Sequence, residues 1–351
     1  MKIAIDVSPL ESGHKVRGVG FYLSHLKQAL LTHYPENDYL FFRQGETIDA
    51  SADLVHYPYF DPFFLTLPLV KKKKTVVTVH DLTPLVFPDH FPAGLKGNLK
   101  WQLQKYNLRR VDGIIADSKA SKNDILKIIG MPSEKVAVAY LAAGEEFKAL
   151  EKSKLKAESL RKKYNLPETF ALYVGDVTWN KNLPRLVQAV KKINVPLVMV
   201  GKALVLQDFD RHNRWNSDLV EVQRLVDQST NILRLGFVST EDLVSLYNLA
   251  TTFVFPSVYE GFGLPIVEAM QSGCPVITSR EGCMPEVGGD AVVYFDGYNI
   301  DSLANAIKNV MNSKTLQKEL AEKGLEQSKK FSWKKTADKT IEAYQKALLN
   351  K

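Results

Sequence analysis

The sequence predicts an α/β protein of two domains, each built on a parallel sheet with flanking helices. A chain of 351 residues exceeds the usual size of a single hydrophobic core. Short apolar runs alternate with helical patterns along most of it, which is typical of βαβ units. A polar, lysine-rich stretch at residues 148–167 separates two series of similar kind. Because open α/β sheets bind ligands at the carboxyl ends of their strands, we expect two facing sheets with the site in a cleft.

The positions of these runs define the expected elements. The first series contains strands at Lys2–Asp6, Tyr39–Arg43, Leu54–Tyr57, Thr75–His80, Gly113–Asp117 and Val136–Ala139, and helices at Gly20–His33, Leu95–Arg110 and Ser118–Ile129. The second contains strands at Phe170–Val174, Pro196–Val200, Ile232–Leu235, Thr252–Pro256, Pro275–Thr278 and Ala291–Phe295, and helices at Leu183–Ile193, Thr240–Leu249, Leu264–Ser272 and Ile300–Asn312. The domains are therefore placed at residues 1–165 and 166–330, followed by a C-terminal helix at 331–351.

The composition favours some classes of ligand and binding partner over others. The formal net charge of +7 and the pI of about 9.1 favour anionic ligands or an anionic membrane surface, without demanding nucleic acid. No run of about 18 apolar residues occurs, and the N-terminus resembles a strand rather than a signal peptide. The two cysteines, Cys274 and Cys283, lack metal-ligand or redox spacing. A reducing cytoplasm is the expected compartment.

Residues 255–270 carry the strongest chemical signal. A strand is followed by a glycine-bearing loop, and Pro265 lies in the first turn of the next helix, where its missing N–H would be unpaired anyway. The N–H groups of Gly263 and Leu264, together with the helix dipole, form a site for phosphate or carboxylate. Phe262 belongs to the same loop.

Two carboxylates flank this loop. Glu260 precedes it, and Glu268 lies one turn into the helix. A carboxylate suits a diol, because its two oxygens accept two O–H hydrogen bonds. Taken alone, the pattern also fits a plain strand–helix connection with two surface glutamates.

A second strand–loop–helix segment runs from Val174 to Leu183 and includes Gly175 and Thr178. It ends in Lys181, and a lysine at such a place can neutralise a phosphate group. A surface lysine without a ligand is the alternative.

The first half offers weaker signals. His80 stands at the carboxyl end of a strand, where a structural role is more common than a catalytic one. Gly18 and Gly20, after Arg17, open a helix at a point where the backbone can approach an anion. Asp117–Ser118 ends another strand on the same side of the sheet.

Together these segments resemble the retaining glycosyltransferases of family 4 (glycosyl transferases group 1), which have the GT-B fold of two Rossmann-like domains. The resemblance covers nearly the whole chain. Its motifs are Glu260 and Glu268 in the E-x7-E spacing, Gly-Phe-Gly-Leu-Pro at 261–265, Gly273–Thr278, Pro285–Gly289 and His80-Asp81-Leu82. The resemblance also implies that the last helix crosses back onto the N-terminal domain.

The resemblance implies roles for these residues. Glu268 would hold the ribose hydroxyls of a nucleotide-sugar donor, Glu260 would lie near the transferring sugar, and Lys181 would meet the leaving diphosphate. The remaining expected contacts are His80 to the donor sugar or acceptor, Gly236, Phe237 and Val238 to the base through the backbone, and Gly18, Gly20, Gly175, Thr178, Phe262, Gly263 and Leu264 to phosphate or sugar. Asn180 stands where the family often has an arginine, so Arg185 or Lys202 would have to supply one phosphate contact.

The implied activity is transfer of a mannose- or glucose-type sugar from a nucleoside diphosphate sugar to a glycan or lipid-linked acceptor, with retention of configuration. No cofactor or metal is expected, because Asp208-Phe209-Asp210, which formally matches a metal-binding D-x-D, lies in a charged loop. An inactive nucleotide-sugar-binding module and a sugar-nucleotide epimerase are the alternatives. Lys71–Lys74, after an apolar run, would either dock on an anionic membrane or form a solvated loop.

Overall fold

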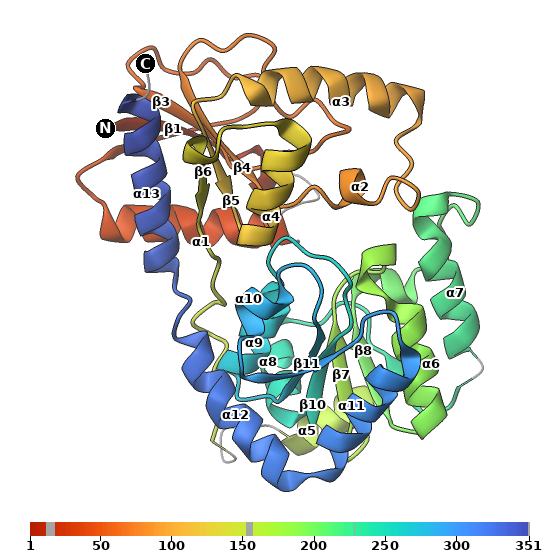
Figure 1. Cartoon of the computed structure of the whole chain (residues 1–351). Coiled ribbons are helices and arrows are strands. Elements are labelled where there is room, and N and C mark those ends of the chain that lie inside the picture. Colours follow the sequence, from red (N-terminus) through yellow and green to blue (C-terminus); the bar gives the residue numbers. More distant parts are fainter. Residues whose placement is uncertain (12–17, 152–156, 228, 350–351) are drawn as a thin grey trace. The chain divides into compact units, whose positions relative to one another are not determined.

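The computed structural model (Figure 1) describes residues 1–11, 18–151, 157–227 and 229–349. The chain divides into two compact units. Unit 1 combines Met1–Ala142 with Phe331–Lys351, and unit 2 comprises Ala143–Lys330. In each unit the described residues build a six-stranded sheet whose paired strands are all parallel. The α/β class and the two parallel sheets are therefore confirmed.

The sheet of unit 1 has the strand order β2-β1-β3-β4-β5-β6. Its strands are β1 (Lys2–Asp6), β2 (Asp38–Phe42), β3 (Leu54–Tyr57), β4 (Lys74–Val79), β5 (Gly113–Ala116) and β6 (Val136–Val138). Its α-helices are α1 (Gly18–His33), α2 (Thr83–Val86), α3 (Gly94–Arg109), α4 (Lys119–Asp124) and α13 (Trp333–Leu349), and α4 continues into a π-helical turn at Ile125–Ile129.

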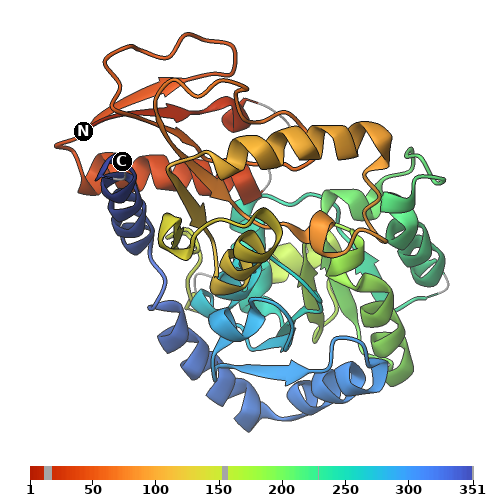
Figure 2. The same ribbon diagram turned by 45° about the horizontal axis from the view of Figure 1, so that its top comes forward.

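Different helices cover the two faces of this sheet, because successive side chains of a strand point to opposite faces. On one face Val77 belongs to the core that contains Trp101 and Leu108 of α3. On the other face His56 of β3 meets Tyr344 of α13. Helix α13 also lies against α1, as both views show (Figures 1 and 2). The C-terminal helix therefore packs on unit 1.

A chain of buried hydrogen bonds anchors α13 to the sheet. The Tyr344 hydroxyl lies 2.7 Å from Nδ1 of His56, and Nε2 of His56 lies 2.8 Å from Oγ1 of Thr78. Thr78 in turn contacts the hydroxyl of Tyr22 on α1 at 3.0 Å. Burial, with the charge of His80 nearby, lowers the pKa of His56 to about 3. The ring is therefore neutral, and one nitrogen donates while the other accepts.

The sheet of unit 2 has the order β12-β11-β10-β7-β8-β9. Its strands are β7 (Ala171–Val174), β8 (Leu197–Val200), β9 (Ile232–Arg234), β10 (Thr252–Phe255), β11 (Val276–Ser279) and β12 (Val292–Phe295). Its α-helices are α5 (Ala157–Tyr164), α6 (Leu183–Ile193), α7 (Ser217–Val226), α8 (Thr240–Leu249), α9 (Leu264–Gln271), α10 (Met284–Gly288), α11 (Ile300–Asn312) and α12 (Lys314–Ser328).

The boundary between the units differs from the expected one. The sequence places residues up to 165 in the first domain, whereas the compact units divide after Ala142. Helix α5 packs on α8, where Lys163 and Tyr164 both reach the carboxylate of Asp242 at 2.6 Å. The polar stretch thus belongs to unit 2 because its helix contacts that unit. None of the helices in the described ranges is long and apolar enough to cross a membrane.

The buried chain around His56 predicts a measurable loss of stability. Tyr344→Phe removes the partner of a buried ring nitrogen, so we expect the free energy of unfolding to fall by about 1–3 kcal/mol. The matched control is Tyr106→Phe. Because Tyr106 is exposed, removing its hydroxyl should lower the free energy of unfolding by less than about 0.5 kcal/mol. Chemical denaturation of both variants measures the difference. Equal losses would show that the His56 contact contributes no more than a surface contact.

Candidate active site

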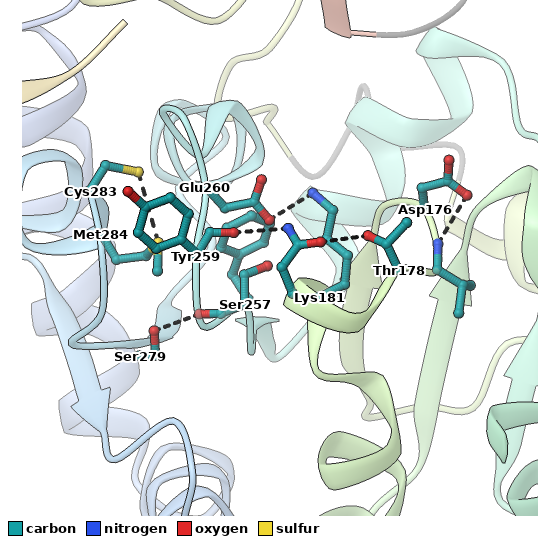
Figure 3. A network of polar contacts seen from close by, with 12 residues as sticks. Asp176, Thr178, Lys181, Ser257, Tyr259, Glu260, Ser279, Cys283 and Met284 are labelled. Carbon is teal, nitrogen blue, oxygen red and sulfur yellow. Dashed lines mark hydrogen bonds and ion pairs between the residues drawn. The ribbon is translucent and has the colours of Figure 1, made fainter. Parts of the chain in front are cut away.

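Most of the residues that the sequence singles out in unit 2 lie at one edge of its sheet. β7 and β10 are parallel neighbours, with Ala171 paired to Thr252 and Leu172 to Phe253. The loops that follow the two strands therefore emerge side by side. Both loops carry candidate residues, and they are drawn together in Figure 3.

The two loops are tied together through Asn180. Its side-chain Nδ2 donates to the carbonyl of Tyr259 at 2.9 Å, and its own carbonyl accepts from the N–H of Val258 at 2.8 Å. Thr178 completes the turn by donating from Oγ1 to Oδ1 of Asn180 at 2.7 Å. Asn180 is buried. It therefore holds the loops together rather than facing a ligand as an arginine would.

Lys181 and Glu260 face each other across this junction. The Nζ of Lys181 lies 2.7 Å from Oε1 of Glu260 (Figure 3), and their side chains are 20% and 13% exposed. Lys181 also lies 5.7 Å from the ring centroid of Phe255 at the end of β10. Two of the three expected catalytic residues are thus brought into direct contact, in a place where water screens their charges only partly.

Helix α9 begins where the sequence predicts. Gly263 adopts φ +88° and ψ +47° immediately before Leu264, and a Cβ there would approach Ile266 to 3.3 Å. This left-handed conformation favours glycine. Pro265 lies in the first turn, as expected. Pro265 has no N–H, and Ile266 donates to the carbonyl of Gly263 at 2.9 Å. The N–H groups of Gly263 and Leu264 have no acceptor within the helix, which makes this end suited to an anion.

Glu268 is buried on the inner side of α9. Its Oε2 accepts a hydrogen bond from the hydroxyl of Tyr247 at 3.0 Å. Burial raises the pKa of the Glu268 carboxyl to about 7, with the charge of Glu146 acting in the same direction and the Tyr247 hydrogen bond opposing. A buried carboxyl whose pKa lies near the neutral point gains from any ligand that brings O–H donors to it.

Further candidates share this edge. The N–H of Gly175 bonds to Val200 at the end of β8, and the N–H of Gly201 bonds to the carbonyl of Gly236 after β9, both at 2.9 Å. Gly236 has φ +66°, and a Cβ there would meet Val205 at 2.9 Å. The next side chain, Phe237, is 73% exposed. Val238 and Phe262 are buried, so they support the loops that carry the exposed groups.

In unit 1, His80 at the end of β4 contacts Asp117, a pairing that the sequence did not predict. Nδ1 of His80 lies 2.7 Å from Oδ2 of Asp117 at the end of the neighbouring strand, and Nε2 lies 3.1 Å from the carbonyl of Pro58. Both neighbours are hydrogen-bond acceptors, so both ring nitrogens are best satisfied as donors, as in an imidazolium. Burial alone would lower the pKa of His80, but the charge and hydrogen bond of Asp117 outweigh it and raise that pKa.

Comparisons with known proteins identify the family. Residues 156–327 match "Glycosyl transferases group 1", and residues 8–142 match "Glycosyltransferase Family 4". The O-antigen chain mannosyltransferase B of Escherichia coli is 31% identical over 305 residues, which are 84% of this chain and 76% of that protein. The chain belongs to glycosyltransferase family 4.

Solved structures share the GT-B fold of this family-4 glycosyltransferase. Sucrose-phosphate synthase from Thermosynechococcus elongatus matches with a TM-score of 0.76 at 20% identity, covering 98% of each chain. HepE from Anabaena, solved in complex with UDP and glucose, matches with a TM-score of 0.73 at 18% identity, covering 98% of this chain and 99% of that one. At such identities the likeness concerns the fold.

Arg185 and Lys202, the two residues expected to replace the family's arginine, have different surroundings in the structure. Nη1 of Arg185 donates to Oδ1 of Asn182 at 2.7 Å, and its guanidinium lies over the ring of Tyr298. Asn182 in turn holds Pro256 and Gly297 through its amide nitrogen. Arg185 therefore supports the loop after β7. Lys202 follows β8 and stays a candidate for phosphate.

The remaining candidates are the D-x-D pair of unit 2, the two glycines of α1 and Arg17. In the described residues no three His, Cys, Asp or Glu side chains gather as metal ligands, and Asp210 accepts from the N–H of His212 within its own loop. Gly18 and Gly20 lie inside the first turn of α1, where Gly18 is exposed. Arg17 lies outside the described residues.

The contact between His80 and Asp117 predicts a titration result. Asp117→Asn removes the charge that holds the proton, so burial then dominates and the pKa of His80 should fall to or below its ordinary value. NMR titration of the histidine ring signals measures it. The control is Asp112→Asn, because Asp112 lies at the other end of β5 and pairs with Lys71 and Lys74. An unchanged or higher pKa in Asp117→Asn would contradict the assigned contact.

Proposed function

We propose that the chain transfers a mannose- or glucose-type sugar from a nucleoside diphosphate sugar to a glycan or lipid-linked acceptor, with retention of configuration and without a metal. The ion pair between Lys181 and Glu260, beside the start of α9, is the observation that carries this proposal. It puts a cation, a carboxylate and a helix N-terminus at one edge of one sheet. A sugar diphosphate offers the complementary groups, namely phosphate oxygens and sugar hydroxyls.

Lys181 acts on the leaving group. In the free protein its charge is balanced by Glu260 at 2.7 Å. When a diphosphate is bound, its oxygens compete with the carboxylate for the ammonium group, and the N–H groups at the start of α9 add to the attraction. As the bond to the sugar breaks, negative charge grows on that phosphate, so these groups stabilise the transition state most. Glu260 is then free to accept from sugar hydroxyls.

Glu268 and the loop after β9 hold the nucleoside. The buried carboxyl of Glu268 accepts from one hydroxyl already, and a ribose diol supplies two more donors. Backbone groups of Gly236–Val238 contact the base, with the exposed ring of Phe237 next to them. The loop residues Gly175, Thr178, Phe262, Gly263 and Leu264 belong to the same proposed donor site.

Unit 1 supplies the remaining contacts in this proposal. In this proposal His80 keeps its Nδ1–H on Asp117 and turns its Nε2–H from the carbonyl of Pro58 to the sugar or acceptor, so it acts as a hydrogen-bond donor rather than as a base. Gly18 and Gly20 approach phosphate or acceptor through their backbone. The glycan acceptor is supported by the relative named as an O-antigen chain mannosyltransferase. Cytoplasmic localisation is part of the same proposal.

Two alternatives make different predictions. A binding module that has lost activity would bind the nucleotide sugar without consuming it. An epimerase would convert the donor's sugar without any acceptor. Incubating the protein with labelled UDP- and GDP-linked glucose and mannose, with and without a mixture of acceptor glycans, separates the three, because only a transferase moves label to the acceptor.

Lys181→Ala tests the proposed chemistry. With the donor that supports transfer, turnover should fall on the order of 10²-fold, since one contact to the developing charge is lost. Lys192→Ala is the control and should change turnover little, because Lys192 lies in the last turn of α6 and pairs there with Asp301. Activity of the wild type should persist in excess chelator. If turnover of Lys181→Ala stayed within about twofold of wild type, another residue would contact the phosphate. If chelation abolished activity, Asp208 and Asp210 would again be candidate metal ligands.

A further inference from the structure

Helix α3 exposes a row of apolar side chains along its outer side. Leu95, Leu99, Leu103 and Tyr106 are 91%, 67%, 42% and 57% exposed. Their spacings of four, four and three residues place them on one face of the helix. Isolated exposed leucines are ordinary on a protein surface, but a continuous row along a helix marks an interaction site.

The opposite face of α3 already has its partners. Trp101, Gln104 and Leu108 are buried, and Trp101 and Leu108 belong to the core of unit 1. Nε2 of Gln104 donates to the carbonyl of Phe64 at 2.6 Å and to Oγ1 of Thr66 at 2.7 Å. The helix is therefore fixed in its orientation, and the exposed row cannot turn inward.

The segment before β4 extends this surface. Phe64, Leu69 and Val70 are 62%, 61% and 69% exposed. Phe64 lies beside the middle of α3, and Nζ of Lys71 donates to the carbonyl of Arg110 at the end of the helix at 2.9 Å. We call the exposed row of α3 and these three residues the apolar surface of unit 1.

Every charged side chain that accompanies the row on α3 is basic. Residues 94–110 contain five basic side chains and no acidic one: Lys96, Lys100, Lys105, Arg109 and Arg110. On helical spacing, Lys96 and Lys100 lie on one flank of the row, and Lys105 and Arg109 on the other. The nearby carboxylate of Asp112 is balanced by Lys71 at 2.7 Å and Lys74 at 3.2 Å. The surface is therefore apolar in the middle and positive at its margins.

The apolar row and its basic margins together indicate which partner binds this surface. An apolar row between cations matches the boundary of an anionic bilayer, where acyl chains meet negatively charged headgroups. A second copy of this chain is a poorer match, because a face-to-face pair would place basic margins against each other. The lysine run at 71–74 alone is not enough, since Lys71 and Lys74 are paired with Asp112 and Lys73 donates to the carbonyl of Ala50.

We propose that the apolar surface of unit 1 docks the protein on an anionic lipid bilayer, with Leu95 and Leu99 entering the interface and the lysines of α3 contacting lipid phosphates. The proposal does not rest on the donor chemistry, because it concerns unit 1 alone and its test needs no transfer reaction.

Cosedimentation of the full chain with vesicles tests it. Wild type should bind phosphatidylcholine vesicles that contain phosphatidylglycerol, bind pure phosphatidylcholine weakly, and lose affinity as salt is raised. Leu95→Ser/Leu99→Ser should lower the affinity about tenfold or more. Lys96→Gln/Lys105→Gln should lower it for the anionic vesicles only, by about fivefold for each lysine.

The matched control is Leu31→Ser/Leu349→Ser, which removes two exposed leucines from α1 and α13 and should bind like wild type. The substituted side chains are exposed except for that of Lys105, which is half-buried, so circular dichroism should show an unchanged fold. Binding of the α3 variant equal to that of wild type, or equal binding to both vesicle types, overturns the proposal. So does a wild-type dimer in light scattering that the α3 variant converts to a monomer, because the surface would then join two copies.

Discussion

The parallel pairing of β7 with β10 is the constraint on which the candidate site depends. It brings the ends of two strands that are about 80 residues apart in the chain to one edge of the sheet. Asn180 then joins the loops through its amide and its carbonyl. Without this junction Lys181 and Glu260 would be two solvated charges on separate loops. With it they meet at 2.7 Å, and a donor phosphate has a cation in a fixed place.

The two glutamates of the motif are in different physical states. Glu260 is paired with a lysine and partly exposed, so its carboxylate is already compensated. Glu268 is buried and accepts from the hydroxyl of Tyr247, and burial raises its pKa to about 7. A ligand that donates hydrogen bonds therefore stabilises the ionised form of Glu268 and changes its charge near neutral pH. A bound phosphate would therefore act on Glu260 by competing for its lysine, whereas bound hydroxyls would act on Glu268 directly.

Sequence reasoning identified the strands and the residues at their ends, because apolar runs and glycine-bearing loops report on the backbone directly. It did not identify side-chain partners. Asp117 and His80 come from strands that pair only in the folded sheet. The sequence suggests a missing phosphate contact at Asn180 because the partner of its amide, the carbonyl of Tyr259, lies far along the chain. Helix α12 was missed because its few buried positions leave a mostly polar pattern. The expected boundary at 165 differs from the division of the compact units after Ala142, because composition cannot show that α5 packs on α8.

Calorimetry of nucleotide-sugar binding across pH tests the central claim that the donor is held at this edge of unit 2. Both phosphates of a nucleotide sugar stay ionised near neutrality, whereas Glu268 gains its full acceptor capacity only when ionised. Wild type should therefore bind more tightly as pH rises through about 7. Glu268→Gln should bind weakly and without this dependence. Glu260→Gln should keep the dependence and lose turnover, and its affinity for the free nucleoside diphosphate should stay near that of wild type, because Glu260 contacts only the sugar. Wild-type affinity in Glu268→Gln, or an equal loss in both variants, would contradict the account.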